Sequence, residues 1–414
     1  MLSGRETSPG GAKEQDLRTL FSHSGQESPA ITIAGIGVFA LGMIIALAGT
    51  PDVSDTKNPP ENLNSLLEPI LKKYDLPALA GAIVTSKGLS AVGAVGVRKY
   101  GTDTPVTIND QFHLGSDTKA MTATLLATLV EEGKLSWTAT LEQVFPELAA
   151  KMDPAYRKVT LEQLLSHRAG FTDESWPQGK TFKDMPELPG TPREQRAAYV
   201  AMILSERPVS EPGSTYLYSN RSYAVAGAMA EKIANDSWED LMQKRIFQPL
   251  DMRTCGFGAM GTPTDDPKKI DQPWQHKLLL TFHRPIAPGP LADNPAVIGP
   301  AAAVHCSIVD WGKFIKAHLR GEAGEKGILK PETFKRLHTP SFGGNYAFGW
   351  LVVDRPWAGG AALNHAGSNT QNYAVVWMAP AKDFAVLVMT NQGDTFDACD
   401  ATAAALIAHF AQRK

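Results

Sequence analysis

The chain of 414 residues contains little cysteine and no excess of either charge. Its three cysteines, Cys255, Cys306 and Cys399, form no C-x-x-C motif, and an odd number of cysteines allows at most one bridge here. The ten histidines are scattered, without an H-E-x-x-H pair. We therefore predict neither a disulfide framework nor a metal centre. A formal net charge of −3 gives no reason to expect nucleic-acid binding.

One long uncharged run lies near the N-terminus, at residues 30–49. At about 1.5 Å per residue, a helix of this length spans the roughly 30 Å of bilayer hydrocarbon. The polar residues 1–29 are typical of a disordered tail, and residues 50–61 of a linker. We favour a membrane anchor, because the leader is long for a signal peptide; cleavage after Ala48 is the alternative. Since basic residues concentrate before the run, either interpretation exports residues 62–414 to the periplasmic or extracellular side.

The rest of the chain has the composition of a globular protein, since 43% of all residues are hydrophobic and 20% charged. Strand-like stretches lie near both ends, within residues 79–97 and 346–390, and helical patterns fill the middle. We predict a mixed α/β (α+β) fold, with an antiparallel sheet flanked by helices and built from about 62–115 and 290–414. An all-helical lobe of about 116–289 is inserted between them. A cleft is expected at the seam.

A serine begins the most apolar of these helices, and a lysine follows three positions later. Residues 120–130 carry no charge, which is typical of a buried helix, and Ser116 and Lys119 on its first turn share one face. Burial disfavours the charged form of a lysine, and a neutral amine beside a hydroxyl is a general base beside a nucleophile. The same pattern recurs at residues 54–57, but a polar, proline-bearing linker cannot bury a lysine. We therefore assign the chemistry to Ser116.

Two later motifs offer groups that complete such a site. Tyr218 and Asn220 alternate, so on an extended segment both side chains point the same way, where a phenol can relay a proton and a carboxamide can hold a substrate amide. Gly367 lies in a strand-turn-strand stretch and allows another backbone to approach. The N–H of Ser368 could then point into the cleft. Together with the N–H of Ser116 at a helix N-terminus, it would form an oxyanion hole.

In this order, Ser-x-x-Lys at Ser116, Tyr-x-Asn at Tyr218 and His-x-Gly at His365 resemble the three-motif signature of penicillin-recognising serine hydrolases. The chain is most similar to the branch with class C β-lactamases, D-alanyl-D-alanine carboxypeptidases, D-aminopeptidases and related esterases. Shorter matches extend the resemblance at residues 164–171, 249–252 and 346–350. It covers the chain from about residue 61 to the C-terminus.

The resemblance implies a serine hydrolase that cleaves a D-amino peptide, ester or lactam-like substrate through an acyl-enzyme, without cofactor or metal. It implies Ser116 as the nucleophile and Lys119 with Tyr218 in proton transfer; which of the two is the base stays open. The implied substrate-binding residues are Asn220, His365, Gly367 and Ser368. A second interpretation also stays open, a membrane-anchored penicillin-binding or scaffold protein with weak or no hydrolytic activity.

One departure from the family pattern shapes the expected substrate. The β-lactamases of this branch carry Lys-Thr-Gly where this chain has His365-Ala366-Gly367, which argues against an efficient β-lactamase and leaves peptidases and esterases open. A histidine with a reference pKa of about 6.5 loses its charge over the physiological range. If His365 faces the substrate, carboxylate-bearing substrates should bind more weakly as pH rises. If it only bonds at a strand edge, Arg221 is the alternative anion site.

Overall fold

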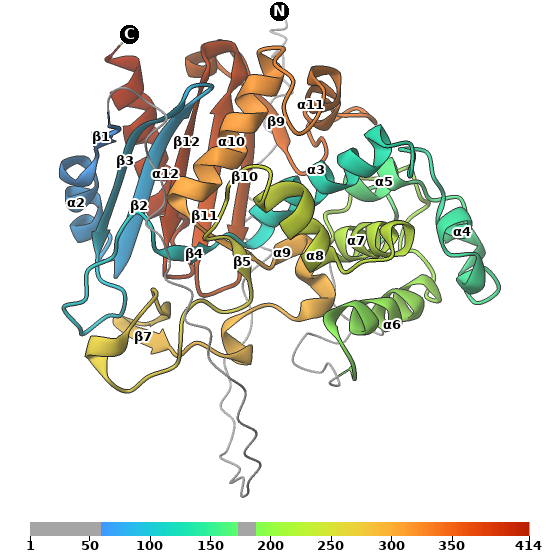
Figure 1. Ribbon diagram of the computed structural model, residues 1–414, viewed down its shortest axis with the longest axis horizontal. Helices are drawn as coiled ribbons and strands as arrows, with labels where there is room; N and C mark the ends of the chain where they lie inside the picture. Colours follow the sequence, from blue (N-terminus) through green and yellow to red (C-terminus); the bar gives the residue numbers. More distant parts are fainter. Residues whose placement is uncertain (1–58, 173–187, 414) are drawn as a thin grey trace, which may run out of the picture. The chain divides into compact units, whose positions relative to one another are not determined.

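A seven-stranded sheet runs through the folded part of the chain (Figure 1). The computed structural model describes residues 59–172 and 188–413, so residues 30–49 and their predicted membrane role lie outside the described ranges. The strands are β1 (Glu61–Asn62), β2 (Ala78–Thr85), β3 (Gly88–Gly96), β9 (Leu351–Arg355), β10 (Gly360–Ser368), β11 (Tyr373–Ala379) and β12 (Phe384–Thr390). Their order is β1-β3-β2-β12-β11-β10-β9, antiparallel throughout except for the parallel pair β1 and β3.

The sheet joins the two ends of the sequence, as predicted. Strand β2 pairs with β12, with Ala82 opposite Leu387, and this pairing closes the N-terminal hairpin onto the C-terminal strands. The helical segments that the chain passes through between them form the inserted lobe (Figure 1). The predicted mixed α/β architecture with a largely antiparallel sheet is therefore confirmed.

Helices cover both faces of this sheet. On one face, Leu79 and Ile83 of β2 pack with α2 (Asn64–Lys73) and α12 (Phe396–Ala411). On the other face, alternate residues such as Ala82 pack with α10 (Ile308–Glu322). Each fully buried Leu or Ile side chain contributes about 1.5–3 kcal/mol. Covering both faces explains why β2 is apolar along nearly its whole length.

The other helices are α3 (Thr118–Glu131), α4 (Leu141–Val144), α5 (Leu161–Leu165), α6 (Pro192–Leu204), α7 (Asn220–Ala234), α8 (Trp238–Met242), α9 (Gly299–Ala302) and α11 (Pro331–Leu337). Helix α3 is buried from Thr118 to Leu129, because its uncharged sequence has no face that suits water. The predicted capping box at Thr160 is present: its hydroxyl accepts from the N–H of Gln163, whose side chain caps Thr160 in return.

A small three-stranded sheet has the order β4-β8-β5, and its strand β4 leads into the first turn of α3. Its strands are β4 (Gln111–His113), β8 (Val304–Ser307) and β5 (Gly256–Phe257). A disulfide joins Cys255 to Cys306, while Cys399 is a buried free thiol. This is the single bridge that the odd number of cysteines allows.

Two expectations about strands were wrong. The lobe of about 116–289 is not all-helical, because it contains β5, β6 (Gln275–Leu279) and the start of β7 (Phe282–Ile286), and β6 and β7 form a hairpin. Its apolar tip is exposed, with Leu280 92% accessible, so the in-out alternation that marks a strand is missing. The strand expected from residue 346 begins at Leu351, because Tyr346 lies buried in a loop instead.

Candidate active site

Ser116 lies where the small sheet passes into the core helix. Strand β4 ends at His113, and a 3-10 turn, Gly115–Asp117, leads into α3. Gly115 has a φ of +52°, in the left-handed region that favours glycine. Its N–H donates to His113 Nδ1 at 3.0 Å, and His113 Nε2 lies 2.6 Å from Asp293 Oδ1. The turn is thereby fixed, and Ser116 stays partly accessible at its surface.

The amine of Lys119 lies among three oxygens, in a side chain with 0% exposure. Nζ is 3.1 Å from Ser116 Oγ, 2.8 Å from Asn220 Oδ1 and 3.1 Å from the Ala301 carbonyl oxygen. The two carbonyl oxygens can only accept hydrogen bonds. In its neutral form the amine would have two N–H groups to donate to them, and its lone pair would then be left for the hydroxyl of Ser116. The contacts thus orient Lys119 as a base for this serine.

Tyr218 and Asn220 reach the same amine. Lys119 Nζ lies 4.6 Å from the centre of the Tyr218 ring. Asn220 is the first residue of α7 rather than part of an extended segment, because Ser219 caps that helix by accepting from the N–H of Arg221. Both side chains nevertheless lie next to the Lys119 amine. The first turn of α7 directs Asn220 toward it, where an extended segment had been expected to do so. The structure therefore brings the first two motifs together.

The third motif contacts the turn that holds Ser116 through its backbone. Gly367 lies in β10 so close to the nucleophile turn that an added Cβ would overlap the Leu114 carbonyl oxygen and lie 2.5 Å from Ser116 N. A Cβ on Gly115 would overlap Ser368 N in the same way. Ser368 and Ser116 thus have their backbone nitrogens close together, as expected for an oxyanion hole. Both glycines are required by this close approach.

His365 is the third-motif side chain, and it is buried and neutral. It is 7% exposed, with Nδ1 3.0 Å from the Ala366 carbonyl oxygen and Nε2 3.2 Å from Tyr346 Oη. Burial, and then the charge of Lys119, lower the pKa of His365 to about 3. The expectation that its charge disappears over the physiological range is therefore wrong. The alternative anion site, Arg221, is 2% exposed and pairs with Glu206 at 3.2 Å.

Two further residues of this region received no role from the sequence. His167, which is 0% exposed, has Nδ1 3.2 Å from Ser219 N and Nε2 3.2 Å from Tyr346 Oη. Burial lowers the pKa of His167 well below its usual value, with smaller contributions from the charges of Lys119 and His365. Both residues fall inside the stretches 164–171 and 346–350 that matched the family pattern. These family-pattern matches could have drawn attention to His167 and Tyr346, but they do not show which side chains the two residues contact.

A family model described as "Beta-lactamase" matches residues 63–410, which is most of the chain. The chain belongs to the beta-lactamase family. Within this family it is a serine hydrolase of the β-lactamase and penicillin-binding-protein type.

The curated relatives of this chain are named for different activities. It is 25% identical over 333 residues to "Penicillin-binding protein 4" of Amycolatopsis lactamdurans, covering 78% of this chain and 82% of that protein. It is 24% identical over 372 residues to an unguisins hydrolase of Aspergillus campestris, covering 86% of this chain and 65% of that protein. A lovastatin esterase of Penicillium rubens is 29% identical over 170 residues, covering 37% of this chain and 41% of that protein.

Solved structures show the same fold. A D-alanine carboxypeptidase from Burkholderia cenocepacia matches with a TM-score of 0.64 and 21% identity, covering 84% of this chain and 97% of that chain. An octameric penicillin-binding protein homologue from Pyrococcus abyssi also matches with a TM-score of 0.64, at 23% identity, covering 83% of this chain and 76% of that chain. At such identities the likeness concerns the fold.

One acidic group lies between the nucleophile and the lysine. Asp117 is 2% exposed, and neither of its carboxyl oxygens has a hydrogen-bond partner among the described residues. Burial raises the pKa of Asp117 well above its usual value, against a smaller opposing effect of Lys119. Burial thus favours the uncharged form of the Asp117 carboxyl group, which weakens any ion pair with the amine of Lys119. Within the described ranges, no three His, Cys, Asp or Glu side chains gather as a metal site would require.

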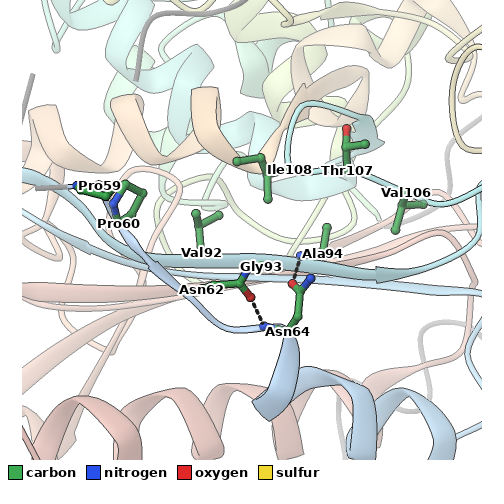
Figure 2. Close-up of a pocket in the computed structure, with 10 residues that line it drawn as sticks. All are labelled: Pro59, Pro60, Asn62, Asn64, Val92, Gly93, Ala94, Val106, Thr107 and Ile108. Atoms are coloured by element: carbon green, nitrogen blue, oxygen red, sulfur yellow. Dashed lines mark hydrogen bonds between the residues drawn. The ribbon is translucent and has the colours of Figure 1, made fainter. Parts of the chain in front are cut away.

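A hollow of about 370 Å³ lies elsewhere, between the start of α2 and strand β3 (Figure 2). In Figure 2, Asn64 Oδ1 accepts from the N–H of Ala94, and Asn62 Oδ1 accepts from the N–H of Asn64. The residues that line the hollow include no acid, histidine, lysine or cysteine. None of the seven predicted site residues is among them. We therefore place the candidate chemistry at Ser116.

Proposed function

We propose that this protein is an exported hydrolase that cleaves an ester or amide through an acyl-enzyme on Ser116. The observation that carries the proposal is the amine of Lys119, with two carbonyl oxygens to receive its hydrogens and the hydroxyl of Ser116 at its third position. A general base within hydrogen-bond distance of a nucleophile is the geometry that acyl transfer needs.

In the proposed reaction, Ser116 Oγ attacks the substrate carbonyl carbon while its proton passes to Lys119. The N–H groups of Ser116 and Ser368 stabilise the negative charge that develops on the carbonyl oxygen. The bond to the leaving group then breaks, and Lys119 and Tyr218 return the proton to it. Water then attacks the acyl carbon while Lys119 and Tyr218 take up one of its protons, the bond to Ser116 Oγ breaks, and that proton passes to Oγ and restores the hydroxyl. Asn220 holds the substrate amide or ester group beside this pair.

The charges near the third motif favour a substrate without a carboxylate next to the scissile bond. His365 is neutral at every physiological pH, and Arg221 is already paired with Glu206. A substrate carboxylate would lose its water there without gaining a partner, which costs more than burying a neutral group. The lovastatin esterase among the relatives is named for an ester substrate, which is one of the two bond types proposed here.

The test compares two p-nitrophenyl acyl esters that differ only in a carboxylate or its methyl ester. Labelling with a fluorophosphonate and with a fluorescent penicillin, and assays of D-Ala-D-Ala peptides, extend the comparison. We expect a kcat/KM at least about tenfold higher for the neutral ester, corresponding to about 1.4 kcal/mol, and a ratio that stays constant from pH 5.5 to 8.5. A preference for the free carboxylate would contradict the substrate class, and no turnover of any substrate would favour the scaffold interpretation.

The uncharged run at residues 30–49 supports export with membrane anchoring. Among the described residues, no helix is long and apolar enough to cross a membrane, so this proposal depends on the run alone. The full-length protein should sediment with membranes and resist extraction by alkaline carbonate. N-terminal sequencing of the mature protein distinguishes the two interpretations, because a start at Gly49 would contradict the anchor and support a cleaved signal peptide.

A further inference from the structure

A line of hydrogen bonds runs behind Tyr218 through three buried side chains. His167 follows α5, Tyr346 lies in the loop before β9, and His365 lies in β10. Tyr346 Oη is 3.2 Å from His167 Nε2 and 3.2 Å from His365 Nε2. One hydroxyl thus connects two imidazoles from separate parts of the fold.

The surroundings fix where each proton lies. His167 Nδ1 accepts from the N–H of Ser219, so in the neutral ring the proton is on Nε2, which donates to Tyr346. The Tyr346 hydroxyl, whose pKa burial raises well above its usual value, keeps its proton and donates it to His365 Nε2. His365 then carries its own proton on Nδ1, which donates to the Ala366 carbonyl oxygen. The hydroxyl of Tyr223 is a further hydrogen-bond neighbour of the Tyr346 hydroxyl, and Tyr223 itself donates to the Leu165 carbonyl oxygen.

Such a line holds its members in place and does not conduct protons. It starts at a backbone N–H and ends at a backbone carbonyl oxygen, and neither of these groups exchanges a proton at neutral pH. A catalytic proton path would need a titrating group at one end. The function of the line must therefore lie in geometry.

The residue held most directly is Tyr218. The His167 carbonyl oxygen accepts from the N–H of Leu217 at 2.8 Å, and His167 Nδ1 accepts from the N–H of Ser219 at 3.2 Å. These bonds fix the backbone on both sides of Tyr218, whose ring centre lies 4.5 Å from that of His167. His167 itself has a φ of +56°, which is uncommon for a residue other than glycine. Such strain persists where surrounding contacts hold it.

We propose that Tyr346 is a positioning residue that, through His167, sets the place of Tyr218 relative to strand β10 and the nucleophile. The proposal rests on the function proposed above, in which Tyr218 takes part in proton transfer. It also assigns a role to His365, whose neutral Nε2 is the acceptor that the Tyr346 hydroxyl requires. A charged lysine at this position has no acceptor, so it would leave the Tyr346 hydroxyl proton with the hydroxyl of Tyr223 and without its partner on β10.

The test is Tyr346→Phe, which keeps the ring and removes only the hydroxyl. Because small misplacements of a catalytic group lower rates strongly, we expect kcat for the preferred ester to fall about 10- to 100-fold. KM should stay within about twofold, since the Tyr346 side chain is buried. A general loss of structure would instead change kcat and KM together. The control is Tyr156→Phe, at a tyrosine that is 2% exposed and stacks on Phe171, and it should keep the wild-type kcat.

A double variant tests whether the line acts as a unit. His365→Gln combined with Tyr346→Phe should lower kcat no further than the stronger single change, because both break the same line. Should Tyr346→Phe fail to fold, His365→Gln and His365→Lys carry the test, with the glutamine variant retaining more activity because it keeps an acceptor. An unchanged kcat in Tyr346→Phe, or fully additive losses, would overturn the proposal. Failure of wild type to react with a fluorophosphonate at Ser116 would instead overturn the proposed function.

Discussion

At the scale of single residues, the surroundings of Lys119 determine what Ser116 can do. Two of its three oxygen neighbours come from distant parts of the chain, Asn220 and the Ala301 backbone carbonyl. The serine and lysine were predictable because a polar pair at the start of an uncharged helix is conspicuous. The Ala301 carbonyl was not predictable, since every residue has one and only the fold brings this one to the amine.

Replacing Lys119 tests the proposed base. Lys119→Ala removes the group that receives the Ser116 proton, and general-base help is worth about 10²- to 10⁴-fold. We expect the rate of fluorophosphonate labelling to fall by that factor, measured by stopped-time gel fluorescence. Lys57→Ala, in the second Ser-x-x-Lys match, is the control and should react at the wild-type rate. A Lys119→Ala protein that folds and labels normally would assign the base to Tyr218.

At the scale of elements, the contact between β10 and the nucleophile turn brings the third motif to the first. Gly367→Ala places a Cβ against the Leu114 carbonyl oxygen and Ser116 N, so the strand must move away from the turn. Loss of one oxyanion-hole donor costs about 10²–10³ in kcat. We therefore expect ester turnover to fall by at least about tenfold, measured by burst and steady-state kinetics.

The control for this change is Gly327→Ala, where an added Cβ meets nothing within 4 Å. It should leave turnover unchanged and alter the melting temperature little. Wild-type turnover in a folded Gly367→Ala protein would show that the close approach of β10 does not form the oxyanion hole.

The helices and strands also show which parts of the fold could be predicted from the sequence. The paired strands β2 and β3, the final strand β12 and the capping box at Thr160 follow from local pattern, and the structure contains them. The hairpin of β6 and β7 was missed because its apolar residues face outward. Tyr346 was assigned to a strand because its neighbours are apolar, while its hydroxyl is bonded to side chains 179 and 19 residues away in sequence. Local patterns contain no information about such partners.

At the scale of the whole molecule, buried histidines predict how stability depends on pH. Burial lowers the pKa of five of them, His167, His276, His305, His318 and His365. The unfolded chain binds protons on these groups below about pH 6.5, whereas folded His276 and His305 bind them only near pH 4. The unfolded state therefore gains more protons as pH falls, so the free energy of unfolding decreases from about pH 6.5 toward pH 4.

Two buried carboxyl groups act in the opposite direction. Burial raises the pKa values of Asp117 and Glu231, so these groups favour the folded state as pH falls. Because the histidines outnumber them, we expect the melting temperature to fall steadily between pH 7 and pH 4.5, as measured by circular dichroism. His276→Gln should make this slope shallower, because it removes one of the groups. A melting temperature that is level or rises toward pH 4.5 would contradict the account.

The proposed mechanism requires Ser116 to be the acylated nucleophile, and intact-mass analysis after fluorophosphonate labelling tests this most directly. Wild type and Ser54→Ala, which alters the second Ser-x-x-Lys match, should each gain the mass of one adduct, and peptide mapping should place it on Ser116. Ser116→Ala should gain none. An adduct of unchanged stoichiometry in folded Ser116→Ala would contradict the mechanism.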